Sequence, residues 1–122
     1  MMLFVFQTSH EVRTLDELRT RLSERHRGMF GAFWLHHDSG SKVAVVVRGG
    51  DAYATFFPAE PHPGFHRHRI EKEKEAPVEF LADNFEATPI PRELVMPTDE
   101  ALAIVEDFFV TGERPKELDF EL

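Results

Sequence analysis

Two short glycine-containing turns separate three apolar runs between residues 29 and 57, and this spacing constrains the fold more than any other feature. The runs cover residues 29–36, 42–48 and 52–57, and they are rich in the aromatic and β-branched residues that favour strands. Asp-Ser-Gly-Ser at 38–41 and Gly-Gly-Asp at 49–51 are turn sequences. Because parallel strands need a crossover of about a dozen residues or more, the spacing predicts an antiparallel meander.

A capping box indicates a helix before the meander. The hydroxyl of Thr14 can accept a hydrogen bond from the backbone three residues on, while Glu17 reaches back to the Thr14 amide. Leucines at 15, 18 and 22 then recur at helical spacing. We therefore expect a helix to about Arg25, with Gly28 ending it and the leucines facing the core.

A second helix is predicted near the C-terminal end of the chain. Thr98 is the candidate N-cap, acidic residues 99 and 100 suit the first turn, and Gly112 stands where a left-handed C-cap belongs. Between the two caps lies a wide apolar face that must be buried. Its residues are Ala101, Leu102, Val105, Phe108 and Phe109.

Weaker patterns suggest further strands at 3–6, 65–70 and 78–81. We interpret the apolar run at 3–6 as a strand rather than as part of a signal peptide. The alternating charges at 71–75 indicate a solvated segment or an edge strand. Pro89 and Pro91 argue against regular structure just after the predicted strand at 78–81. Together the elements predict an α+β fold with a single antiparallel β-sheet and two main helices packed on one face. Residues 1–122 fit a single domain.

The net charge of −8 is unevenly distributed. Residues 1–50 carry five acids and seven bases, residues 51–98 nine and five, and residues 99–122 eight and two. A direct nucleic-acid ligand needs clustered lysine and arginine, so a basic protein partner is the better expectation. The absence of cysteine excludes disulfides and thiolate sites and favours a cytoplasmic location. No stretch reaches the roughly 18 apolar residues of a membrane-spanning helix.

The seven histidines are the feature that most invites a site hypothesis. His66 and His68 would share one face of a strand, with His62 just upstream, which leaves a histidine-based metal- or small-molecule-binding domain as an alternative. Two ligands fall short of the three or four that zinc requires, so we expect no metal and no cofactor. Asp38, Ser39 and His36 have the residue types of a catalytic triad, but proximity in sequence is not triad geometry, and the turn already explains Ser39. Trp34 and Tyr53 are interpreted as core aromatics.

The end of the chain carries a more specific pattern. A helix ending in paired phenylalanines is followed by Thr-Gly-x-Arg-Pro and then by Leu-x-Phe. The pattern resembles the first-numbered immunity-protein family of bacterial polymorphic toxin systems, in which tryptophan is more usual at the last aromatic position. The matching residues are Phe108, Phe109, Thr111, Gly112, Arg114, Pro115, Leu118 and Phe120. Residues 43–57 and Pro63-Gly64-Phe65 also resemble that family, more loosely.

The resemblance implies a protein that binds a cognate toxin domain, a deaminase or a nuclease, and blocks its active site without catalysing a reaction. We expect the motif itself to be structural, with Gly112 and Pro115 ending the helix, Arg114 satisfying its last carbonyls, and Leu118 and Phe120 anchoring a final strand. Loops carry function more often than framework does, so partner contacts are expected in the charged middle of the chain. The candidates are Asp51, Tyr53, Glu60, His62, Phe65, His66, Glu71, Glu73, Glu75 and Glu79.

Overall fold

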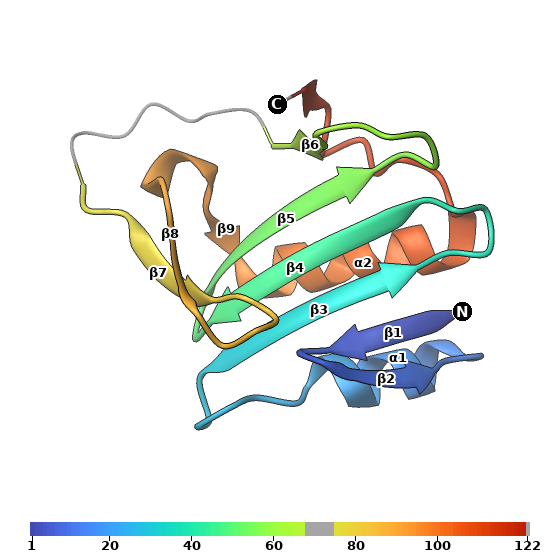
Figure 1. The fold of residues 1–122 in the computed structure, drawn as a ribbon, viewed down its shortest axis with the longest axis horizontal. Coiled ribbons are helices and arrows are strands. Elements are labelled where there is room, and N and C mark those ends of the chain that lie inside the picture. Colours follow the sequence, from blue (N-terminus) through green and yellow to red (C-terminus); the bar gives the residue numbers. More distant parts are fainter. Residues whose placement is uncertain (68–74, 122) are drawn as a thin grey trace.

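A twisted antiparallel sheet organises the molecule (Figure 1). The computed structural model describes residues 1–67 and 75–121. Its main sheet has the order β10-β6-β5-β4-β3-β1-β2, with β9 paired to β5. The strands are β1 (Met2–Val5), β2 (Thr8–Glu11), β3 (Phe30–His36), β4 (Lys42–Arg48), β5 (Asp51–Phe57), β6 (Phe65–His66), β9 (Met96–Pro97) and β10 (Phe120–Glu121).

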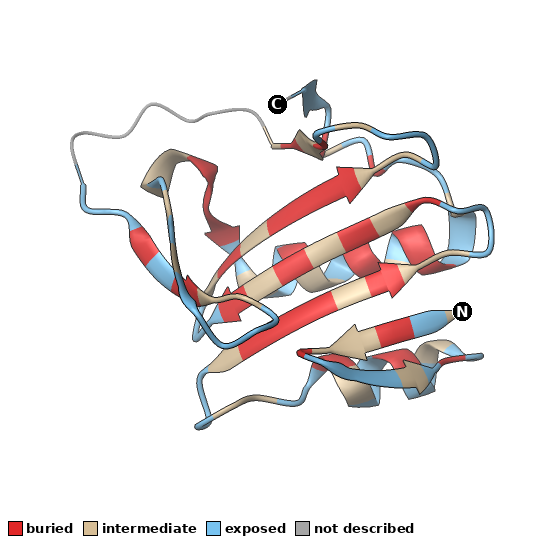
Figure 2. Ribbon diagram, in the orientation of Figure 1, coloured by how far each residue is buried: buried red, intermediate tan, exposed pale blue. Residues whose placement is uncertain are grey.

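The predicted meander is confirmed in β3, β4 and β5, which pair antiparallel across the two predicted turns. Side chains alternate between the two faces of these strands, as Figure 2 shows in bands of buried and less buried residues. In β4, Val43, Val45 and Val47 are buried on one face, while the residues between them are partly exposed on the other. The predicted α+β fold is therefore confirmed.

Helices α1 (Leu15–Leu22) and α2 (Thr98–Thr111) both pack on one face of the main sheet, behind it in Figure 1. Leu18 and Leu22 of α1 are buried against the sheet, as the leucine spacing predicts. Helix α2 buries Ile104 in addition to most of the predicted face, and Leu102 is only partly buried. These contacts make the principal core, on what we call the inner face of the sheet.

Both ends of helix α1 differ in detail from the prediction. Thr14 does cap α1, accepting from the Glu17 amide at 3.1 Å, but Glu17 accepts from the amide of Arg13 at 2.7 Å rather than from that of Thr14. Helix α1 ends at Leu22, earlier than expected, because Ser23 already takes the capping position. Gly28, with a φ of +69°, belongs to the turn that follows.

Thr98 is the first residue of α2 and not its side-chain cap. Its hydroxyl donates to the carbonyl of Gly49 at 2.8 Å, which ties the start of the helix to the turn between β4 and β5. Gly112 closes the other end as predicted, with a φ of +68° and its amide donating to the Phe108 carbonyl at 2.7 Å. A short 3-10 helix, η1 (Arg92–Leu94), precedes β9.

A second sheet corrects the expectation of a single one. Strands β7 (Val78–Leu81) and β8 (Ala87–Ile90) form a two-stranded hairpin that lies across the other face of the main sheet, in front of it in Figure 1. Strand β8 contains Pro89, contrary to the expectation that the prolines would prevent regular structure. The structure accommodates it because β8 pairs only with β7, and an edge strand can lack an amide donor.

Candidate functional site

The outer face of the main sheet, opposite the helices, is only half covered. The β7–β8 hairpin packs Val78 and Phe80 against Val46 and Tyr53, which forms a small second core. Beyond the hairpin, the outward side chains of β1, β3, β4 and β5 stay partly exposed. We call this uncovered part the open face. Its residues are Phe4, Trp34, His36, Lys42, Ala44 and Phe57, with Thr55 buried among them.

Aromatic rings dominate the open face. The rings of Trp34 and Phe57 stack at 5.3 Å between centroids with an interplanar angle of 18°. Their strands lie on either side of β4, and the small side chain of Ala44, the cross-strand partner of Trp34, lets the rings meet above it. His36 lies 4.9 Å from the ring of Phe4. Partial burial, and secondarily the charge of Lys42, lower the pKa of His36, so this imidazole is neutral at pH 7.

Two hollows open onto this surface beside the tip of the β7–β8 hairpin. The first has a volume of about 210 Å³ and lies between Trp34 and Phe57 on the sheet and Ala82 and Asp83 on the hairpin. The wall of the second again includes Trp34 and Asp83, together with Phe4. The open face is therefore an aromatic surface with two hollows, and the carboxylate of Asp83 lies at its border.

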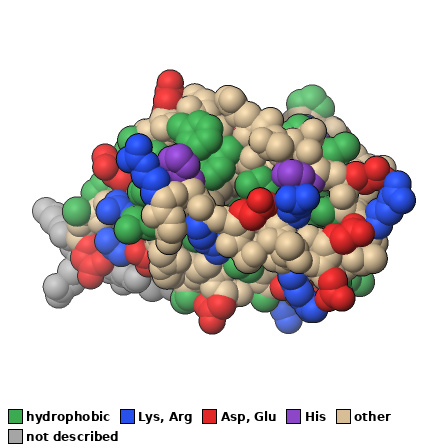
Figure 3. All heavy atoms as spheres, turned by 90° about the horizontal axis from the view of Figure 1, so that it is seen from below, with side chains coloured by type: hydrophobic (Ala, Val, Ile, Leu, Met, Phe, Trp, Pro, Cys, Tyr) green, Lys and Arg blue, Asp and Glu red, His purple; other side chains and the backbone are tan. Residues whose placement is uncertain are grey.

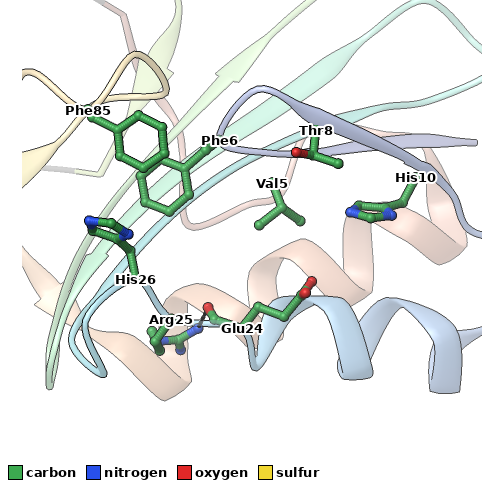
Figure 4. A pocket seen from close by; sticks show the side chains of 8 residues that line it. All are labelled: Val5, Phe6, Thr8, His10, Glu24, Arg25, His26 and Phe85. Carbon is green, nitrogen blue, oxygen red and sulfur yellow. Dashed lines mark hydrogen bonds between the residues drawn. The ribbon is translucent and has the colours of Figure 1, made fainter.

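The hairpin tip is fastened by an unusual contact between two strained residues. Phe6, in the β1–β2 turn, and Phe85, in the β7–β8 turn, have φ values of 52° and 65°, a region that bulky residues rarely occupy. Their rings stack at 4.4 Å with an interplanar angle of 4° (Figure 4). Such strain persists only where the surroundings enforce it. The stack thus holds the hairpin tip against the β1–β2 turn.

Below this stack lies a third hollow, of about 330 Å³, walled by Phe6, His26 and Val5, with His10 at its far side (Figure 4). The Arg25 guanidinium at its floor donates to the carbonyl of Leu22 at 2.5 Å, so it serves the end of α1. Burial lowers the pKa of Arg25. Figure 3 shows the molecule from the α1 and β2 side, where histidine and hydrophobic side chains lie among charges of both signs. This mixture favours no single ligand.

The predicted contact residues that lie within the described ranges do not form one surface. Asp51 and Glu75 converge on Arg92, whose Nη1 and Nε lie 3.5 Å from their respective carboxylate oxygens. Tyr53 packs beneath the β7–β8 hairpin, and Glu79 is exposed on that hairpin. Glu60 is exposed in a loop, and Glu71 and Glu73 lie outside the described residues.

Three further predicted contacts lie together around β6. His62 stacks on Phe65 at 4.6 Å, and its Nε2 lies 3.7 Å from a carboxylate oxygen of Glu121 in β10. His66 is 2% exposed, and its Nδ1 lies 2.7 Å from the carbonyl oxygen of Arg67. A buried His66 presents no surface to a partner, so in this structure it supports β6 and β10.

The histidines show no metal centre in residues 1–67 and 75–121, where no three potential ligands come together. His68, the third member of the predicted histidine set, lies outside those ranges. In the β3–β4 turn, the Nδ1 of His37, rather than a nitrogen of His36, approaches Ser39, accepting from its amide at 3.1 Å. The hydroxyl of Ser41 donates to the Gly112 carbonyl at 3.1 Å, so this group of polar residues joins the turn to the end of α2.

Half of the residues of the family-like motif are buried, and one prediction made for the motif is wrong. Phe108 and Leu118 are fully buried, Phe109 and Pro115 are buried, and Thr111 accepts from the Glu113 amide. Phe120 of β10 pairs with His66 of β6 and is 44% exposed. Arg114 does not serve the carbonyls of α2 as predicted, because its guanidinium lies 4.9 Å above the ring of Phe65. The motif thus secures the C-terminal segment to β6.

Sequence reasoning missed the open face. Trp34 was interpreted as core, and neither Phe57 nor Asp83 was singled out. The alternation in β3 and β5 does place Trp34 and Phe57 opposite the inward-facing residues, which is the one signal that could have found them.

No helix in the described ranges is both long enough and apolar enough to cross a membrane. Neither a scan against known protein families nor a search among curated proteins found a match for this chain.

Proposed function

We propose that this chain is an immunity protein that binds a toxin domain of a bacterial polymorphic toxin system and covers its active site. Two independent features support the proposal. The C-terminal motif resembles that family, and the outer face of the sheet leaves an aromatic surface half uncovered. The second feature is the observation that carries the proposal, because it gives the chain a place to hold a partner.

Aromatic side chains are enriched at the centres of protein interfaces, where a few well-packed anchors supply most of the binding energy. Trp34 and Phe57 meet this description, since they form a fixed stack beside a hollow into which a partner side chain can pack. A stable complex buries roughly 800 Å² on each partner. The open face and the exposed side of the β7–β8 hairpin together offer a surface around which such a contact can be centred.

The charge distribution favours a basic partner. Residues 75–91, which include the hairpin beside the open face, contain four acids and no base. A toxin domain that acts on nucleic acid needs a basic groove to hold its substrate. Negative charge on the inhibitor then speeds association and raises specificity for that groove. In this account the protein needs no cofactor, catalyses no reaction and works in the cytoplasm.

Co-expression tests the proposal directly. The toxin domain encoded beside this chain should kill or arrest cells when expressed alone, and the chain should restore growth. An exposed substitution on the far side of the molecule, Asp107→Asn in α2, serves as a matched control and should protect equally well. Continued killing in the presence of the folded chain would rule out the proposed function.

A further inference from the structure

The groove between the open face and the β7–β8 tip combines an aromatic wall with a carboxylate. Trp34 and Phe57 line the first hollow together with Asp83, and Trp34 and Asp83 also line the second. Asp83 is therefore the residue of the hairpin that borders both hollows beside the stacked rings. A flat aromatic face and a nearby carboxylate are the two groups that recognise a guanidinium or an ammonium together.

The carboxylate of Asp83 is available for such a contact. Asp83 is exposed at the hairpin tip, and no hydrogen bond or ion pair joins its side chain to another of the described residues. The remaining acids of the hairpin are Glu79 and Glu86, both exposed, and no base occurs between residues 75 and 91. The charged side chains of the hairpin are therefore all acidic, which favours a cation that approaches the rings from this side.

The basic groups of the outer face do not oppose a cation in the groove. Lys42 is the cross-strand neighbour of His36 and of Phe57, and it lines neither hollow. His36 borders the second hollow, but burial and Lys42 lower its pKa and keep it neutral at pH 7. Arg48 donates to the carbonyl of Glu79 at 3.2 Å and lies over the ring of Phe30, at the other end of the hairpin.

We infer that this groove binds an arginine or lysine side chain that projects from a basic protein partner, stacking it on Trp34 and pairing it with Asp83. The inference deepens the proposed function, since it rests on a toxin domain being that partner and identifies where the partner is held. The Phe6–Phe85 stack acts as a positioning contact, because it fixes the loop that carries Asp83 above the sheet.

A fluorescence titration can test the groove without the toxin. Trp34 is the only tryptophan of the chain, so its emission reports on this groove. The probe is the blocked tripeptide acetyl-Gly-Arg-Gly-amide, and the control is the same peptide with citrulline, which keeps the shape of arginine but has no charge. We expect a saturable change in Trp34 emission with the arginine peptide, at millimolar affinity, and a change at least threefold weaker with citrulline. Equal responses to the two peptides would overturn the inference.

Matched variants locate the effect at the carboxylate. Asp83→Asn should weaken binding of the arginine peptide about two- to fivefold, as expected for one exposed ion pair, whereas Asp107→Asn on the far side should leave it unchanged. Phe85→Gly should weaken it as well while the chain remains folded, because the tip loses its fixed position. Equal affinities in the two aspartate variants would also overturn the inference.

The failure of the groove can be told apart from the failure of the proposed function. If the wild-type chain protects cells and Asp83→Asn with Trp34→Ala protects equally well at matched expression, the groove is wrong and the immunity function stands. If the arginine peptide binds as expected but the chain never protects cells, the immunity function is wrong and the groove stands for another basic protein.

Discussion

The two faces of the main sheet are built from the same strands but differ in how they are covered. On the inner face, apolar residues such as Val43, Val45 and Phe33 are sealed under two helices. On the outer face, Trp34 and Phe57 stay partly exposed beside a two-stranded hairpin. The period-two alternation of the strands therefore gives the sheet one face that is sealed in the principal core and one face that stays partly open.

The largest expected effect contrasts a phenylalanine of the principal core with one on the open face. Phe108→Ala removes a fully buried ring that α2 packs against the inner face, and it should lower the free energy of unfolding by about 3–5 kcal/mol. Phe57→Ala on the open face should lower it by only about 1–2 kcal/mol, because that ring is half-buried. Urea denaturation of both variants measures the difference. Equal losses would remove the contrast between the faces.

Gly112 tests how tightly the inner layer closes. Its φ of +68° disfavours any side chain, and a Cβ there would overlap the ring of His37 in the β3–β4 turn. Gly112→Ala should therefore cost about 2 kcal/mol or more of unfolding free energy, from the strained φ and the overlap together. Thermal and urea unfolding should show this loss. A stability equal to that of the wild type would mean that the end of α2 is loosely packed.

On the outer face, the stabilities of two Phe85 variants test whether the hairpin tip is strained. Phe85→Gly and Phe85→Ala both remove the ring, but only glycine relieves the backbone strain at φ 65°. The glycine variant should therefore be about 1 kcal/mol more stable than the alanine variant. At Ala103, exposed in the middle of α2, the order reverses, and Ala103→Gly should cost about 1 kcal/mol. The same order at both sites would contradict strain at the hairpin tip.

The smallest effect is a pH dependence from His36. Its pKa is lowered in the folded chain, by burial first and then by Lys42, so the unfolded chain binds more protons just below the ordinary pKa of about 6.5. Stability should therefore fall as the pH falls through that window, and it should be insensitive to His36 above it. His36→Gln should lose less stability than the wild type between pH 7.5 and 5.5. Parallel curves for the two proteins would mean that His36 is fully solvated.

The elements that could be predicted from the sequence are those with strong local signals. The meander follows from β-branched runs and glycine turns, and α2 follows from its apolar face and Gly112. Strand β2 was missed because its four residues, Thr8–Glu11, are all polar, and their pairing with β1 depends on the two-residue turn at Phe6. Strand β8 was missed because Pro89 is acceptable only in an edge strand.

The open face could not be predicted because it depends on tertiary packing. Sequence periodicity assigns Trp34 and Phe57 to the same side of the sheet, but it does not reveal that the β7–β8 hairpin stops short of them. Nor does it reveal that Phe85 reaches Phe6 across 79 positions of the chain and so fixes Asp83 beside the rings. Among the acidic residues chosen from the sequence, Asp51 and Glu75 lie together on Arg92, while Glu60 and Glu79 lie elsewhere.

The central claim is tested most directly by the affinity of this chain for an inactive form of the toxin domain that we propose as its partner. The test compares the binding of the wild type and of Trp34→Ala by calorimetry, once circular dichroism has shown that both proteins are folded. The account predicts that removing this half-exposed ring weakens the complex by at least about 2 kcal/mol, or some thirtyfold, as expected for an interface anchor. An unchanged dissociation constant would contradict the assignment of the outer face as the surface that holds the partner.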